Sequence, residues 1–237
     1  MTRSLPRAAA SVVLAAALTA CTTQLGGHQS PDPSAQVDPA GQLSATGAPK
    51  LRFRPVLATT AQNRPTGRQQ VEPTKATTPE RLREIADEKK TRQGADLSNR
   101  DDPAYQVVLQ AYECPATDPL TGEDDPALPL ITCNQDNTEK YVLGPVFLDN
   151  TQVSSSVASV DQQGAGSVIT LKFTDQGTKV WADFTTANVQ EQVALVFNTT
   201  TISAPTINEP ILGGTTQISG AFTLPEAKRL ADQIAGR

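Results

Sequence analysis

Apolar and β-branched residues in this chain fall mainly into short runs that alternate with polar residues or end at turn-forming clusters. Alternation with a period of two residues, and short continuous apolar runs, are the patterns of β-strands. Val153–Val160 and Ser167–Phe173 flank the cluster DQQGAG, and together they predict a hairpin. The other expected strands are Leu51–Ala58, Tyr105–Tyr112, a stretch near Lys140–Leu148, Gln192–Phe197, and one or two strands within Ile202–Phe222.

Two segments show instead the spacing of an amphipathic helix, with apolar residues three and four positions apart. Thr174 is placed to cap the first helix, whose apolar face consists of Val180, Trp181, Phe184 and Ala187. The second begins at a capping box formed by Thr223 and Glu226, and it would bury Ala227, Leu230, Ala231 and Ile234. Strands interspersed with two such helices predict an α+β fold, in which a mixed or antiparallel β-sheet is packed by two main α-helices.

The first half of the chain carries weaker patterns. Thr77–Lys90 has a capping box of Thr77 and Glu80, and its narrow apolar face consists of Leu82, Ile85 and Ala86. Because the rest of this segment carries mixed charges, we expect a helix on the surface. In the strand LRFRPVLA, Pro55 cannot donate a hydrogen bond to a neighbouring strand, which indicates an edge position.

The distribution of aromatic residues sets the domain boundaries. Nine of the ten aromatic residues follow Ala104, so we expect the packed core within residues 104–237. Residues 21–49 consist mostly of Gly, Ser, Pro, Gln and Asp, the composition of a flexible tether. Residues 50–103 then hold one strand, a polar linker and the surface helix.

The N-terminus has the composition of a targeting segment. Arg3 and Arg7 precede an apolar stretch from Ala8 to Leu18, which is shorter than the ~20 residues that span a bilayer. It ends in LTAC, which resembles the lipobox of bacterial lipoproteins, so residues 1–20 are expected to be a lipoprotein signal peptide. The resemblance implies that Cys21 is lipidated and anchors the protein to the outer face of the cell membrane. The alternative is an ordinary secretory signal that is cleaved near Ala20 and leaves Cys21 free.

Two further cysteines, Cys114 and Cys133, are expected to form a disulfide, because an even pair in an oxidising compartment favours one. Closing a loop of this length contributes roughly 3 kcal/mol in the chain-entropy model. A metal site would lack third and fourth ligands, and a redox pair normally has C-x-x-C spacing. The disulfide is therefore the preferred interpretation.

Little in the chain suggests other chemistry. The net charge of −5 gives no indication of a nucleic-acid partner, and His28, the only histidine, lies in the tether where nothing would orient it. The sequence contains no phosphate-binding loop, no H-E-x-x-H and no G-x-S-x-G. The acidic clusters DPLTGEDD and NQDNTE are better explained as solvated loop carboxylates than as calcium ligands. We expect no enzyme, no cofactor and no metal site.

The C-terminal third of the chain carries a family resemblance. ISAPTINEPILGGTTQISGAFTLPEAKRLADQI resembles the end of the head part of the first periplasmic domain of the protein-export subunit SecD. LKFTDQGTKVWADFTTANVQEQVALVF resembles the strand, helix and strand that precede this motif in the family. TCNQDNTEKYVLGPVFL and LRFRPVL resemble segments of its actinobacterial members, so the likeness extends from about Leu51 to Gln233.

Within this motif several residues shape the backbone. Pro205 and Pro210 mark an edge or a strand break, Gly213 and Gly214 are expected to reverse the chain with positive φ angles, and Gly220 allows a close approach. An edge strand beside a groove can capture an extended peptide by backbone pairing. Since the resemblance implies contact with a translocating chain, the candidate peptide-binding edge is Ile202, Ala204, Ile207, Ile211, Ile218 and Phe222.

The sequence also departs from the family. We expect no transmembrane helix before Leu51 or after Arg237, so the membrane carboxylate and arginine that the family uses for proton coupling are absent, as is the base of the first periplasmic domain. The turn before Ile202 is Asn198-Thr199-Thr200 where the family has an Asp-Gly-like pair. The resemblance thus implies a non-catalytic, extracytoplasmic lipoprotein whose partners are unfolded secretory polypeptides or Sec translocase components. The alternative is a structural or interaction protein of the cell envelope that retains the head fold. The oligomeric state is left open.

Overall fold

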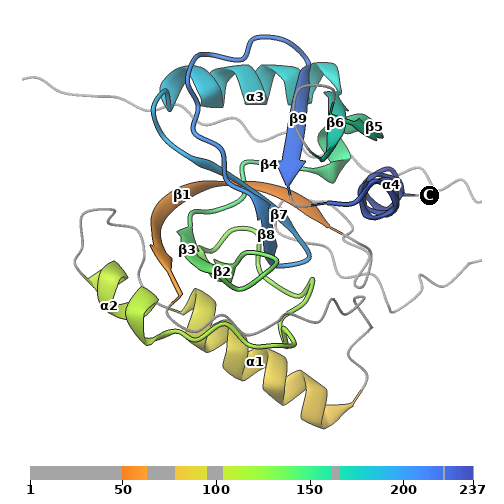
Figure 1. Cartoon of the computed structure of the whole chain (residues 1–237). Helices are drawn as coiled ribbons and strands as arrows, with labels where there is room; N and C mark the ends of the chain where they lie inside the picture. Colours follow the sequence, from red (N-terminus) through yellow and green to blue (C-terminus); the bar gives the residue numbers. More distant parts are fainter. Residues whose placement is uncertain (1–49, 63–77, 95–103, 162–165, 221, 237) are drawn as a thin grey trace, which may run out of the picture. The chain divides into compact units, whose positions relative to one another are not determined.

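Two antiparallel β-sheets and four α-helices make up the part of the chain that the structure, a computed structural model, describes: residues 50–62, 78–94, 104–161, 166–220 and 222–236 (Figure 1). The helices are α1 (Pro79–Gln93), α2 (Ala104–Ala111), α3 (Asp175–Ala187) and α4 (Leu224–Ile234). The strands are β1 (Leu51–Ala61), β2 (Leu130–Cys133), β3 (Glu139–Leu143), β4 (Leu148–Asp149), β5 (Val153–Val160), β6 (Ser167–Phe173), β7 (Val193–Phe197), β8 (Thr200–Ser203) and β9 (Thr215–Gly220). The α+β fold is as predicted.

The larger sheet has the strand order β2-β3-β1-β7-β8, and the short β4 also pairs with β1. All of these pairs are antiparallel. The two outer strands come close to each other, because Asn134, which follows β2, forms a bridge with Thr201 of β8. The Thr132 hydroxyl also donates a hydrogen bond to the carbonyl of Thr199 in the β7–β8 turn. These contacts bring the ends of the sheet together, so β8 has a neighbour on each side.

The smaller sheet has the order β5-β6-β9, and its β5–β6 hairpin is the one predicted. The main core lies between this sheet, α3, α4 and the first half of β1. At its centre the Phe53 ring of β1 makes edge contacts with Phe173 and Trp181, at centroid distances of 5.7 and 5.4 Å. A second cluster of buried residues, which includes Ile85 of α1 and Leu120, packs against β2, β3 and β7.

Helices α3 and α4 begin at the residues that the sequence indicated. The Thr174 hydroxyl accepts a hydrogen bond from the Gly177 amide at 3.1 Å, and Thr223 forms a capping box with Glu226. The four residues expected on the buried face of α4 are all buried. None of the helices in the described ranges has the length and apolar character needed to cross a bilayer.

Residues 105–112 were expected to be a strand, and this expectation is wrong. Helix α2 covers most of this segment, and the Tyr112 amide donates to the Val108 carbonyl at 2.9 Å, as in an α-helix. The adjacent β-branched Val107 and Val108 favour a strand locally. Packing decides otherwise, since the helix buries Leu109 fully against Ile131 and Val142 while it leaves Val107 66 % exposed.

The edge position predicted from Pro55 is also wrong, because β1 is the central strand of its sheet. The Pro55 carbonyl accepts from the Gly144 amide, so the backbone of Pro55 faces the end of β3 and not β7. At this point the β3 strand has ended and β4 has not begun. The missing N–H of Pro55 therefore costs no ladder bond, although the strand is central.

Helix α1 is held by its C-terminal end and not by the predicted apolar face. Its N-cap is Thr78, one residue later than expected, while Thr77 lies outside the described residues. Of the three residues expected on that face only Ile85 is buried, whereas Leu82 is 54 % exposed. Arg92 and Gln93 are buried at the other end, where the Arg92 guanidinium donates to the Ile131 carbonyl at 2.7 Å.

The described glycines near β9 do not have positive φ angles, and Gly220 matters because it lacks a side chain. Among the described glycines only Gly122 and Gly236 have positive φ, so the expectation for Gly213 and Gly214 is wrong. Two of the left-handed non-glycine residues, Asn198 and Thr199, lie in the β7–β8 turn with φ of 47° and 69°, and the others described are Asn137 and Gln190. Gly220 was expected to let the helix or another backbone approach closely; the close neighbour is instead the side chain of Phe222, since a Cβ atom at Gly220 would lie 2.4 Å from that ring.

Candidate functional site

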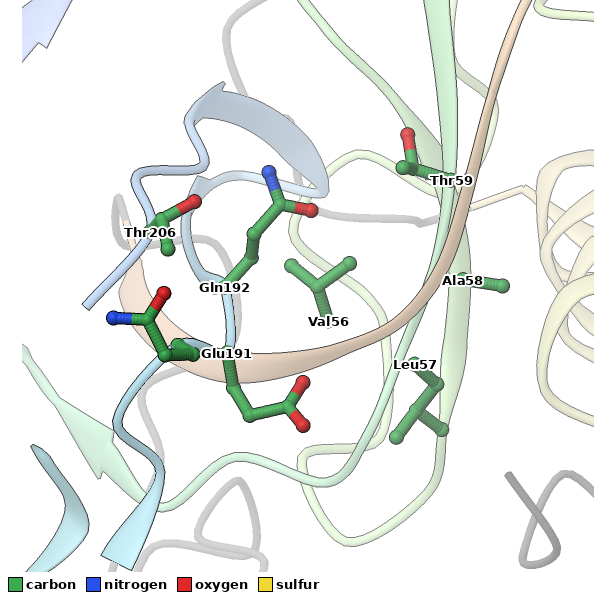
Figure 2. A pocket seen from close by; sticks show the side chains of 8 residues that line it. Val56, Leu57, Ala58, Thr59, Glu191, Gln192 and Thr206 are labelled. Atoms are coloured by element: carbon green, nitrogen blue, oxygen red, sulfur yellow. The ribbon is translucent and has the colours of Figure 1, made fainter. Parts of the chain in front are cut away.

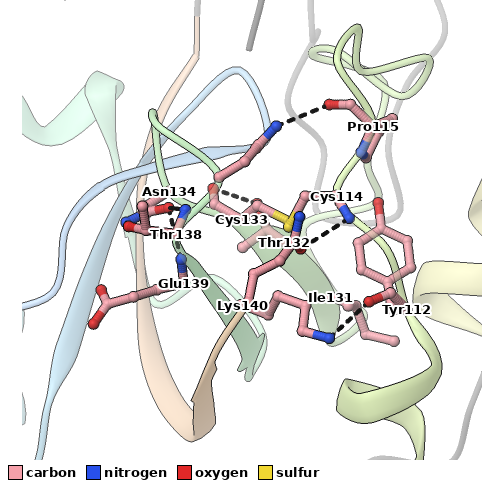
Figure 3. The surroundings of a disulfide bond; sticks show 12 residues. Tyr112, Cys114, Pro115, Ile131, Thr132, Cys133, Asn134, Thr138, Glu139 and Lys140 are labelled. Carbon is pink, nitrogen blue, oxygen red and sulfur yellow. Dashed lines mark hydrogen bonds between the residues drawn. A yellow bond between two sulfur atoms is a disulfide. The ribbon is translucent and has the colours of Figure 1, made fainter. Parts of the chain in front are cut away.

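The predicted disulfide between Cys114 and Cys133 is formed, and it joins the chain after α2 to the end of β2 (Figure 3). The Cys114 amide donates to the Gln62 side chain at 3.1 Å, and the Lys140 ammonium group donates to the Tyr112 carbonyl at 2.8 Å. Both cysteines are buried, with exposures of 3 % and 1 %. The bond thus fixes the loop of residues 114–133 to the larger sheet, and we assign it a structural role.

Two acidic residues of this loop, Asp118 and Asp124, are buried, in contrast to the prediction, whereas Asp125 is exposed. Asp124 is 5 % exposed, accepts a hydrogen bond from the Arg54 guanidinium at 2.7 Å and forms an ion pair with Arg52. Asp118 is 4 % exposed, and it accepts from the Arg92 guanidinium at 2.6 Å and from the Thr199 hydroxyl at 2.8 Å. The loop folds inward because these carboxylates neutralise arginines of β1 and α1.

Burial and pairing shift the pKa values of these groups. Burial lowers the pKa of the Arg54 guanidinium to about 10, and the nearby Asp124 carboxylate offsets only part of that effect. Burial alone would raise the pKa of Asp124, but the charges of Arg52 and Arg54 outweigh it and the pKa is lowered. Both groups are therefore charged at neutral pH. Within the described ranges, no three acidic, cysteine or histidine side chains gather where they could hold a metal ion.

The six residues proposed as a peptide-binding edge lie mostly inside the protein. Four of them are buried in the main core, Ile211 packs partly buried against it, and Ala204 packs against the second cluster; the four are Ile202, Ile207, Ile218 and Phe222. Their side chains point inward because each lies on the face of its segment that covers the core. The structure therefore assigns these side chains to packing, where an added peptide would not meet them.

An open groove lies elsewhere, at the point where β1 changes its partner. Residues Leu51–Pro55 pair with β7, whereas Val56–Ala61 pair with β3, and a bulge separates Val56 from Ala58. The Val56 amide donates to the Gln192 carbonyl at 3.1 Å. Beyond this bond, β1 and the segment of residues 190–192 diverge, and a groove of about 690 Å³ lies between them (Figure 2). Its lining consists of Val56, Leu57, Ala58, Thr59, Gln190, Glu191, Gln192 and Thr206.

The hydrogen-bond pattern shows which backbone groups face this groove. The Gln62 amide donates at 2.7 Å to the carbonyl of Thr138, which directly precedes β3. In an antiparallel pair such bonded positions alternate, so Ala58 and Thr60 also face β3. The N–H and C=O groups of Thr59 and Ala61 therefore point to the opposite edge of β1. That edge is the one that pairs with β7 in the first half of the strand, and no described strand pairs with it beyond Val56.

The side chains of the groove are small or neutral apart from Glu191. On the β1 side they are Leu57, Ala58 and Thr59, and the other side is formed by Gln190–Gln192 with Thr206 (Figure 2). The Thr59 hydroxyl donates to the Lys140 carbonyl at 3.2 Å, which turns this side chain toward β3. An extended backbone, and not a charged small molecule, suits such a surface.

The sequence offered only one indication of this groove. Pro55 signals an interruption in strand pairing, and the structure places it directly before the point where β1 leaves β7. The proposed segment of residues 202–222 contributes only Thr206 to the lining. The lipidation site Cys21 lies outside the described residues and stays a prediction.

Comparison with known proteins agrees with the resemblance seen in the sequence. Protein translocase subunit SecD of Mycobacterium tuberculosis H37Rv is 39 % identical over 153 residues, which cover 63 % of this chain and 26 % of that protein. The SecD of Streptomyces coelicolor is 32 % identical over 142 residues, covering 55 % of this chain and 25 % of its own length. The chain thus spans about a quarter of the length of these curated relatives.

Among solved structures, one described as a membrane component SecDF that enhances protein export aligns with a TM-score of 0.42 and 22 % identity, over 80 % of this chain and 63 % of that one. A family model described as SecDF, P1 head subdomain, matches residues 129–236. This range holds β2 to β9 with helices α3 and α4. Over residues 129–236 the chain is therefore similar to the SecDF P1 head subdomain.

Proposed function

We propose that this chain is an extracytoplasmic protein that acts in protein export, where its head domain binds extended segments of unfolded polypeptide. The 39 % identity with SecD over 153 residues, and the match of residues 129–236 to the SecDF P1 head subdomain, support the role in export. The groove between β1 and residues 190–192 supports the binding activity, and the single observation that carries the proposal is that the backbone groups of Thr59, which lines the groove, and of Ala61, farther along the same edge, point away from β3.

A bound peptide would add as a strand along the second half of β1. It would take the place that β7 occupies along the first half of that strand, so the geometry continues an existing sheet. Main-chain hydrogen bonds would supply affinity, while the neutral side chains around the groove would impose little selection. Capture of this kind is largely independent of sequence, which suits a protein that meets many different exported chains.

Replacing Thr59 with Pro tests this mode of binding. The substitution removes the N–H that faces the groove, whereas the β3 ladder uses Ala58 and Thr60 and keeps its bonds. We expect affinity for an unfolded secreted protein to fall about tenfold, since a backbone bond to the ligand is lost. Fluorescence anisotropy of a labelled client, kept unfolded and then native, measures both affinity and preference.

The matched control is Thr59→Val, which keeps the N–H and the β-branched shape but lacks the hydroxyl that donates to Lys140. It should bind like the unaltered chain, and both variants should melt close to it. If Thr59→Pro binds equally well, strand addition at this edge is wrong. If the unaltered chain binds folded and unfolded clients alike, the protein is an envelope component with a head fold and no role in client capture.

We also propose that Cys21 carries a lipid that holds the protein at the outer face of the cell membrane. The support is the sequence LTAC at the end of a short apolar stretch. Two or more acyl chains on one residue give stable anchoring. Replacing Cys21 with Ser should move the protein from the membrane fraction to the soluble extracytoplasmic fraction. A Ser variant that stays with the membrane would contradict the anchor.

A further inference from the structure

Strand β5 forms one edge of the smaller sheet, and its sequence lacks the residue types that usually protect an edge. Its sequence is VSSSVASV, with no charged residue and no proline. A bulge interrupts its pairing with β6 only at the beginning, between Val153 and Ser155. Natural edge strands are commonly protected by charges, prolines or central bulges, because an unprotected edge is a template for another strand.

The register with β6 identifies the groups that this edge offers. The Asp161 amide donates to the Gly166 carbonyl at 3.0 Å, so the bonded positions alternate back along the strand to Ser159 and Val157. The N–H and C=O groups of Ala158 and Val160 therefore point away from β6. In the described part of the chain, no strand pairs with β5 on that side.

We propose that β5 pairs antiparallel with β5 of a second copy of this chain, which joins the two smaller sheets into one continuous sheet. A twofold axis that passes beside Ala158 would place the two copies of β5 side by side and antiparallel. The outward N–H and C=O groups of Ala158 in one copy would then face those of Ala158 in the other. Val157, which is 59 % exposed, would then lie beside Ser159 of the other copy. These small neutral side chains permit the close contact of cross-strand neighbours.

A folded second copy suits this edge better than a flexible peptide. Its β5 is already extended and held by β6, so pairing requires little further ordering of the chain. Electrostatics also permits a second copy as the partner. The chain carries a net charge of −5, so two copies repel each other, and this repulsion is weakest at a strand without charged residues.

Replacing Val157 with Lys tests the interface, with Gln217→Lys as the matched control. Val157, Thr170 and Gln217 form one row across the sheet, and Val157 and Gln217 are exposed on opposite edge strands. The lysine at position 157 adds like charges beside the axis, and we expect it to raise the dimer dissociation constant about tenfold or more. Gln217→Lys adds the same charge away from the axis and should leave dimerisation unchanged.

Sedimentation velocity of the full chain over a wide range of concentrations measures the dissociation constant. A chain that stays monomeric throughout overturns the proposal, as does a dimer that Val157→Lys does not weaken. A dimer weakened only by Gln217→Lys also overturns it, because the contact would then involve β9. Since β5 is not part of the groove on β1, Val157→Lys should leave binding of unfolded client unchanged, so this result and that of Thr59→Pro are independent.

Discussion

Replacing Asp124 with Asn is expected to lower the free energy of unfolding by about 3 to 5 kcal/mol. The carboxylate is the counter-charge for Arg52 and Arg54, and Arg54 is fully buried. The Arg54 guanidinium also donates to the carbonyls of Leu128 and Gly144, so it cannot turn outward to water without losing those bonds. The variant therefore leaves two arginines in a poorly solvated place without a neutralising partner.

The pH dependence of this loss has a definite sign. The pKa of Asp124 is lowered in the folded protein, whereas in the unfolded chain it lies near its usual value of about 3.9. Between these two values the unfolded chain binds more protons, so stability contributed by Asp124 rises with pH there. It is complete above about pH 4 and disappears as the pH falls through the folded-state pKa. The difference between the unaltered chain and Asp124→Asn should therefore shrink in acid.

Urea unfolding followed by Trp181 fluorescence at neutral and acid pH measures both effects, because Trp181 is buried in the main core. Asp125→Asn is the matched control, since this neighbouring side chain is exposed, accepts from the Ala127 amide and forms no ion pair with an arginine among the described residues; Arg54 contacts only the Asp125 backbone carbonyl, which the substitution keeps. It should change stability by no more than about 0.5 kcal/mol. A loss as small for Asp124→Asn would show that solvent reaches the arginines and that the ion pairs contribute little.

Removing the disulfide by replacing Cys114 and Cys133 with Ser is expected to lower the free energy of unfolding by roughly 3 kcal/mol. The two residues are 19 positions apart, and the bond removes the freedom of that loop from the unfolded chain. In the folded protein the loop supplies both Asp118 and Asp124 to buried arginines. A loop that is no longer tied at its ends holds these carboxylates less firmly.

Urea unfolding of the double Ser variant measures the loss, and the unaltered chain under reducing conditions should match it. Cys21→Ser is the control, because that cysteine lies outside the bonded pair and its replacement should not affect unfolding. We also expect the loss from Asp124→Asn to be smaller in the double Ser variant, since the two features act on the same loop. Strictly additive losses would contradict that coupling.

The sequence predicted those elements whose signals are local. Thr174 and Thr223 mark the starts of α3 and α4 by capping, and the hairpin of β5 and β6 follows from alternation around a turn. Elements determined by distant contacts were not predicted. Tyr105–Tyr112 has the residues of a strand, yet Leu109 is buried only as part of a helix that packs on Ile131 and Val142.

The charged positions show the same limit. Arg52 and Arg54 alternate with apolar residues in β1, a pattern that places arginines in solvent when read alone. They are buried because a loop some 70 residues later brings Asp124 to them. The groove depends on a bulge and a change of partner within β1, and neither has a local sequence signature beyond Pro55. The pattern of neighbouring residues in the sequence therefore could not locate the groove.

The pairing of β1 with β7 also has a consequence for the order in which the protein can fold. The Lys50 amide donates to the Asn198 side chain, 148 positions later in the chain. A chain that crosses a membrane from its N-terminus presents β1 first and must wait for residues near Phe197 before that strand finds its partner. Such long-range pairing slows folding. We therefore expect the domain to complete its fold only after export is nearly finished, so that during its own passage it is itself an unfolded client.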